Sequence, residues 1–275
     1  MTGTALGLTA GVLAAVLFGA AAVVQAHGVR SESEPIDSLR EFVTAAVRNR
    51  HIMLVVAAYL AGFVLHAVSI WYLPLYLAQA AVALSLPVTA LAAARLRERL
   101  GPAEWAAVLA IVAGLVLVSL GSGEPGVGRS SPVFATALWG GVVALAAVGF
   151  SGRATSAGLL GTVAGLGYAG SAIAVRGVAL PLEVPVVAAA LAVPAYGLLA
   201  FWLYSLALNR SAVASSSAPL VVGQTLVPAL VGIWVLDDSV RDGWVAGVVA
   251  GMALAVTGAV LLSRATAREP EAVTR

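Results

Sequence analysis

Long apolar runs are the feature that most constrains what this chain can fold into. Nine of them are close to the roughly 20 residues that a helix needs to cross ~30 Å of hydrocarbon. The runs span residues 4–28, 52–73, 75–94, 104–121, 133–150, 156–177, 187–208, 212–235 and 243–263. The chain is 61% hydrophobic and 10% charged, whereas soluble chains are roughly 45–50% apolar and about 25% charged. We therefore predict an all-α polytopic membrane protein that is solvated by the lipid bilayer.

The arginines predict how the chain is oriented. Nine spans divide the 15 basic residues, all arginine, into twelve on one side of the membrane and three on the other. The three are Arg129, Arg176 and Arg241. Because cytoplasmic loops are enriched in basic residues, the N-terminus is predicted outside and the C-terminus in the cytoplasm. The lysine-free composition, rich in Ala, Gly and Val, favours a bacterial plasma (inner) membrane. The arginines form no basic stripe with interleaved aromatic residues, so nucleic acid is not an expected partner.

One segment between the spans is predicted to be helical without crossing the membrane. Residues 33–48 are too short and charged to span, but their apolar side chains fall on one face at helical spacing. An amphipathic helix on the inner leaflet and a helix docked on the protein both fit this pattern. The aromatic side chains of Trp71, Tyr72 and Tyr76 are predicted to anchor the outer interface.

A weak internal repeat divides the chain into two similar halves. The segment 11–24 aligns without gaps with 161–174, matching Phe18 to Tyr168, and 111–119 resembles 255–263. Each half then contains four spans, and an odd span between them inverts the second copy. The turn 95–104 has a net charge of +1 and its counterpart 237–242 has −2, as opposite compartments would require. Inverted repeats of this kind are common in secondary transporters.

The predicted organisation follows from this repeat. Two inverted four-helix repeats are joined by a linking helix, and a short tail follows. The segments are residues 1–121 for the first repeat, 122–155 for the linking span, 156–263 for the second repeat and 264–275 for a cytoplasmic tail.

Two stretches resemble a known family. The sequence ARLRERLGPAEWAAVLAIVAGLVLVSLG, residues 94–121, is similar to the end of a repeat in EamA-like members of the drug/metabolite transporter superfamily. The stretch VVGQTLVPALVGIWVLDDSVRDGW, residues 221–244, looks like the second copy. The resemblance implies a carrier with two inverted repeats. Replacement of a second span by the segment 33–48 departs from the usual ten-helix plan and resembles the NIPA-like magnesium transporter branch.

The charged groups exclude several kinds of chemistry. Every Asp and Glu lies in a loop or at a helix end, so a buried carboxylate for proton coupling or for a dehydrated divalent cation is missing. The chain has no cysteine and no clustered acid, base and nucleophile, so neither a metal site, a cofactor nor an enzyme activity is expected.

The remaining candidates for transport are mostly neutral. The side chains of Gln25, His66, Gln79 and Gln224 lie within spans, where an unpartnered amide costs on the order of 1–3 kcal/mol. They could line a substrate path or simply hydrogen-bond neighbouring helices, and His66 could also titrate near neutral pH.

Other candidates lie at helix breaks and at a span end. Pro87 and Pro228 are candidate helix breaks for gating, although packing kinks would also explain them. Arg176 could attract an anionic solute to the outer mouth or could snorkel as an anchor.

The function predicted from these features is alternating-access transport of a small organic metabolite or lipophilic compound. Two alternatives stay open at this point: a NIPA-like magnesium permease and a non-transporting membrane scaffold subunit. A homodimer is compatible with the sequence.

Overall fold

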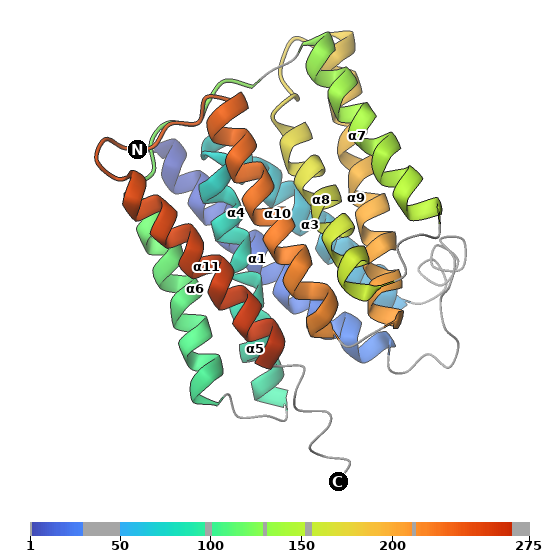
Figure 1. Ribbon diagram of the computed structural model, residues 1–275, viewed down its shortest axis with the longest axis vertical. Helices are drawn as coiled ribbons and strands as arrows, with labels where there is room; N and C mark the ends of the chain where they lie inside the picture. The colour runs from blue at the N-terminus through green and yellow to red at the C-terminus, as the bar shows by residue number, and fades with distance from the viewer. Residues whose placement is uncertain are drawn as a thin grey trace.

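The protein folds into a bundle of helices, seen in a computed structural model that describes residues 2–29, 50–96, 101–128, 131–151, 156–210 and 213–265 (Figure 1). The helices are α1 (Thr2–Val29), α3 (Arg50–Tyr72), α4 (Leu75–Ala83), α5 (Ser85–Leu96), α6 (Pro102–Leu120), α7 (Pro132–Phe150), α8 (Ala157–Val175), α9 (Val184–Arg210), α10 (Val213–Val235) and α11 (Val245–Ala265). Within the described ranges the only β-type pairing is an isolated bridge between Ser122 and Val240. The predicted surface helix 33–48 lies outside the described residues.

Eight segments in the described part of the chain are long and apolar enough to cross a membrane, counting α4 and α5 together. The described apolar part of α10, Pro219–Val235, is shorter. Large apolar side chains cover the outside of the bundle, including Val133, Leu198 and Trp234 at 80%, 63% and 75% exposed. Because such a surface requires an apolar solvent, the all-helical architecture is that of a polytopic membrane protein.

Local sequence explains several helix starts. Ser131 and Ser156 cap α7 and α8 by accepting hydrogen bonds from the backbone N–H groups of Phe134 and Leu159. At the start of α6, the Glu104 carboxylate accepts a hydrogen bond from the Gly101 N–H at 2.6 Å. Each interaction satisfies a backbone donor that the helix itself leaves unpaired.

The third predicted span is interrupted. A turn at Leu84 divides it into α4 and α5, three residues before Pro87. Proline has no backbone N–H and its ring crowds the preceding turn, which accounts for a break at this place. Pro228, by contrast, lies inside the continuous helix α10. Of the two equivalent breaks that were expected, the one near Pro87 is present between α4 and α5. The one at Pro228 is absent, because α10 is continuous there.

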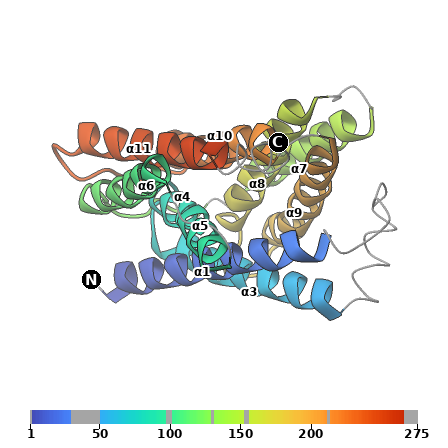
Figure 2. The same ribbon diagram turned by 90° about the horizontal axis from the view of Figure 1, so that it is seen from below.

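The helices pack in two similar groups, visible from below in Figure 2. In the first group α1 packs against α3, α4 and α5, and in the second α8 packs against α9 and α10. Helix α6 also contacts α4, and α11 also contacts α10, so the groups meet where α6 contacts α11 and α4 contacts α10. Helix α7 is peripheral, because only 22% of the residues in its apolar stretch are buried. Helix α8 is central, with 67% of the corresponding residues buried.

Glycines allow the closest of these contacts. A Cβ atom on Gly251 of α11 would lie 2.8 Å from the backbone oxygen of Gly114 in α6. Two turns further along α11, a Cβ on Gly258 would lie 2.7 Å from the Ala107 oxygen. The small residues thus let the two backbones touch, as membrane helices commonly do.

Candidate functional site

Polar groups gather in two places in the described part of the bundle. The first is one end of the molecule, here called the Arg176 end, formed by residues 73–74, 121–128, 176–183 and 236–244. The second is the interior between α3, α4, α8 and α9.

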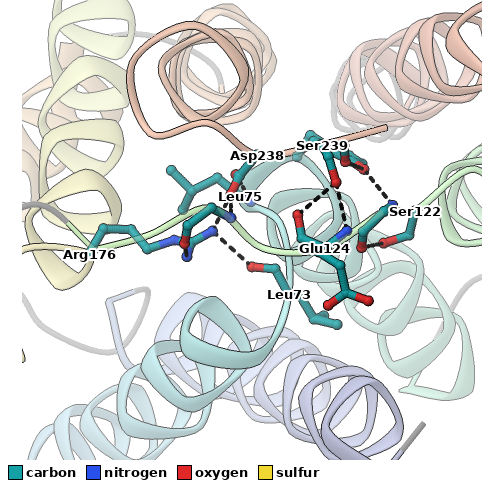
Figure 3. A network of polar contacts seen from close by, with 10 residues as sticks. Leu73, Leu75, Ser122, Glu124, Arg176, Asp238 and Ser239 are labelled. Atoms are coloured by element: carbon teal, nitrogen blue, oxygen red, sulfur yellow. Dashed lines mark hydrogen bonds and ion pairs between the residues drawn. The ribbon is translucent and has the colours of Figure 1, made fainter. Parts of the chain in front are cut away.

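Arg176 is the centre of the polar network at the Arg176 end (Figure 3). It follows the last residue of α8, and its side chain is only 4% exposed. The guanidinium donates to the Asp238 Oδ1 at 2.5 Å, to the Gly126 oxygen at 2.8 Å and to the Leu73 oxygen at 3.2 Å. The arginine therefore does not extend into solvent at the mouth of the bundle. It joins three loops.

Asp238 completes this network from the α10–α11 loop. Its Oδ2 accepts a hydrogen bond from the Leu75 N–H at 2.6 Å, and its Oδ1 accepts one from the Gly126 N–H at 2.7 Å. Leu75 is the first residue of α4, so the carboxylate also lies at the positive end of a helix dipole. The left-handed backbone of Asp237, with φ of 60°, forms the turn just before this buried acid.

We call Leu73, Leu75, Gly126, Arg176 and Asp238 the end network. Burial lowers the pKa of the Arg176 guanidinium, and the Asp238 carboxylate opposes this shift. An arginine has so high a pKa that it stays charged, and its charge is compensated inside the protein by a carboxylate that holds two further donors.

The glycine-rich segment 121–128 lies against the α10–α11 loop. The Ser239 N–H donates to the Glu124 oxygen at 3.1 Å, and the Tyr76 hydroxyl donates to the Ser239 oxygen at 2.7 Å. A Cβ atom on Gly126 would overlap the Leu236 oxygen, so only glycine fits there. Tyr76, predicted as an interfacial anchor, is instead fully buried, whereas Trp71 and Tyr72 are exposed as expected.

Two of the predicted polar residues meet in the interior. The Gln79 amide nitrogen of α4 lies 3.3 Å from the His66 Nε2 of α3, and both side chains are buried. The His66 Nδ1 and the hydroxyl of Ser69, one turn along α3, have no hydrogen-bond partner among the described residues. Gly11 of α1 adjoins this place, since a Cβ on it would lie 2.9 Å from the Ser69 hydroxyl.

Aromatic side chains from four helices form a second interior group, which we call the aromatic cluster. Phe18 of α1 stacks on Tyr59 of α3 with ring centroids 6.0 Å apart, and Tyr59 meets Phe201 of α9 edge to face at 6.4 Å. The hydroxyl of Tyr168 in α8 lies close enough to those of Tyr59 and Tyr204 to interact electrostatically.

The structure does not join the other predicted positions to this interior group by hydrogen bonds. Gln224 is a partly buried residue of α10, and no hydrogen bond between described residues links it to the His66–Gln79 pair. Gln25 belongs to α1, but its side chain lies outside the described residues. In the described part of the chain no group of three His, Cys, Asp or Glu side chains could hold a metal ion.

Sequence reasoning did not single out several residues of these sites. Asp238 was expected in an external loop, and nothing in its local sequence distinguishes it from its exposed neighbours Asp237 and Asp242. Tyr168 did carry a signal, because the repeat alignment matches it to Phe18. Tyr168 and Phe18 both belong to the aromatic cluster. Ser69 could have been noticed from its spacing, since it lies one helical turn after His66.

Comparisons with protein families, with curated proteins and with solved structures found no match to this chain.

Proposed function

We propose that this protein is a membrane transporter that carries a small organic solute by alternating access. The observation that carries the proposal is the interior polar group formed by His66, Ser69 and Gln79. Two atoms of this group, the His66 Nδ1 and the Ser69 hydroxyl, are buried with no hydrogen-bond partner among the residues that the structure describes. Burying an unpaired polar group costs on the order of 1–3 kcal/mol, so its retention favours a binding role.

The helix packing is compatible with the proposed inverted repeat, which supports the same proposal. The packing of α1 with α3 and with α4–α5 has a counterpart in the packing of α8 with α9 and with α10. The pairs that meet across the halves, α6 with α11 and α4 with α10, are those that a two-fold axis would relate. This pattern agrees with the proposed relation to the EamA-like transporters, whose substrate path lies between two such halves.

The end network supplies a barrier that alternating access requires. It ties the α3–α4 turn of the first half and the linker at Gly126 to Arg176 and Asp238 of the second half. A solute could leave toward this end only after these contacts separate. The alternate set of turns in the sequence carries twelve of the fifteen arginines, and we propose that these turns face the cytoplasm of a bacterial plasma membrane.

Solute flux into proteoliposomes tests the proposal. The purified protein is reconstituted, and uptake is measured for a panel of radiolabelled neutral and charged organic solutes, with protein-free liposomes as the control. We expect saturable uptake of at least one solute, reduced at least tenfold by Gln79→Leu and unchanged by Asp242→Asn, which alters an exposed loop residue. Absence of flux for the whole panel, or flux that ignores Gln79→Leu, would contradict the proposal and favour a scaffold role.

Topology is tested separately, because the chain has no cysteine. Thr2→Cys and Ala272→Cys are introduced singly and labelled in intact cells with a membrane-impermeant maleimide. We expect only the first to react. Equal labelling of both positions would refute the odd number of crossings and with it the inverted repeat.

A further inference from the structure

The aromatic cluster joins the two halves of the bundle at one place. Phe18 and Tyr59 come from the first half, and Tyr168, Phe201 and Tyr204 come from the second. Gly62 lets Phe18 lie flat on α3, because a Cβ there would come within 2.7 Å of the Phe18 ring. The aromatic faces are therefore presented where a transported solute would pass between the halves.

The two tyrosines of this cluster are partly rather than fully buried. Tyr59 and Tyr168 keep part of their surface accessible, whereas Tyr76 at the Arg176 end keeps none. Both tyrosines of the cluster can therefore be contacted by a ligand.

The charges near the aromatic cluster restrict which ligands it can bind. No Asp, Glu, Lys or Arg occurs between Arg50 and Arg95, between Arg153 and Arg176 or between Glu183 and Arg210, the stretches that supply α3, α4, α8 and α9. The buried Arg176 and Asp238 pair with each other at one end of the bundle. A charged solute would thus have no countercharge in a medium of low dielectric constant, which is costly.

A polar anchor lies at a defined distance from the rings. Tyr59 and His66 are seven residues apart on α3, so they share a face of the helix and are separated by about 10 Å along its axis. Gln79 and Ser69 add hydrogen-bonding groups beside His66. A ligand that satisfies both ends carries a ring at one end and a hydroxyl or amide at the other.

We propose that this interior binds a neutral aromatic compound, with its ring against Tyr59 and Tyr168 and its polar group at His66 and Gln79. The inference rests on the proposed transport function, for which it names the substrate class. The rings supply stacking and edge-to-face contacts, and the polar residues supply hydrogen bonds that would otherwise be unmade.

Binding of 4-phenyl-1-butanol to the full-length protein in detergent tests this inference. Its ring and hydroxyl are separated by a distance comparable to that between Tyr59 and His66. Equilibrium dialysis of the tritiated compound, corrected with protein-free micelles, gives the affinity. Four matched competitors then separate the contributions: 4-phenylbutylamine is a cation, 4-phenylbutyrate an anion, 4-cyclohexyl-1-butanol lacks the aromatic ring, and butylbenzene lacks the hydroxyl.

We expect the two charged competitors to displace the probe at least tenfold less effectively, and the saturated and hydroxyl-free competitors severalfold less. Tyr168→Leu should weaken binding about two- to tenfold, the range of a single aromatic contact, while Tyr168→Phe should retain it. If Tyr168→Leu does not fold, Tyr59→Leu and Tyr59→Phe provide the same comparison. Gln79→Leu should weaken binding of the alcohol and leave butylbenzene unaffected.

No specific binding of the probe, equal competition by the amine or the carboxylate, or equal affinity of the leucine and phenylalanine variants would overturn the inference. The proposed transport function is tested by different outcomes. Probe binding without flux of any solute would refute transport and leave the aromatic site standing. Flux of an aliphatic solute without binding of the probe would support transport and refute the aromatic site.

Discussion

Replacing Asp238 with alanine tests whether the end network holds the Arg176 end of the bundle together. The change leaves the buried Arg176 guanidinium without its carboxylate, and breaking a buried ion pair in this way costs about 3–5 kcal/mol. It also leaves the N–H groups of Leu75 and Gly126 without an acceptor, each worth about 1–3 kcal/mol when buried. Since neighbouring effects are not additive, we expect a loss of at least ~3 kcal/mol in the free energy of unfolding.

The assay is unfolding of the purified protein by SDS in mixed micelles, followed by circular dichroism. Asp242→Asn, an exposed change in the same loop, is the matched control and should stay within about 0.5 kcal/mol of the parent protein. Arg176→Met combined with Asp238→Ala should be less destabilised than the two single changes added together, because no unpaired cation is then left buried. If Asp238→Ala unfolds like Asp242→Asn, the ion pair contributes nothing to stability and the reasoning is refuted.

Three further predictions concern backbone contacts and the interior. Gly126→Ala should destabilise the protein by about 1–3 kcal/mol in the same SDS titration, because its Cβ would overlap the Leu236 oxygen; a neutral result would show that the loop is loosely packed. Gly251→Ala should cost a similar amount by separating α11 from α6, whereas Gly197→Ala, whose Cβ meets no atom within 4 Å, should be neutral or slightly stabilising; equal effects would contradict the close α6–α11 contact. Gln79→Leu should change the free energy of unfolding by only about 0.6 kcal/mol, the average for a hydrogen bond between membrane helices, so a loss of several kcal/mol would indicate a structural role instead.

The helices could be predicted from the sequence because hydrophobic length is a strong local signal. Each predicted apolar run coincides with a helix, or with the pair α4 and α5, within a few residues. The break at Leu84 was less accessible, because Pro87 and Pro228 look alike in sequence and only one lies beside a break. Whether a helix tolerates proline depends on its neighbours, which periodicity does not reveal.

The candidate site could be predicted only in part. His66 and Gln79 stand out because polar residues are rare in spans, and they do meet. The pairing of Arg176 with Asp238 could not be derived, since it joins residues 62 positions apart through the folding of two loops. Hydropathy assigns both residues to the aqueous boundary, whereas the structure buries them there against each other. Burial at a span end is decided by loop packing, and this is a tertiary property.

The difference between the two halves is itself informative under the proposed mechanism. In a transporter with inverted repeats, each conformational state is asymmetric, because the two copies adopt different shapes that they exchange during the cycle. Here the first half has a divided helix, α4 and α5, where the second has the continuous α10. The N-terminus of α4, which begins after Pro74, is capped by Asp238 of the second half. Under the proposed mechanism the conformation of the first half would therefore be coupled to a contact made by the second, and release of Asp238 from Leu75 would free α4 to change its position relative to α10.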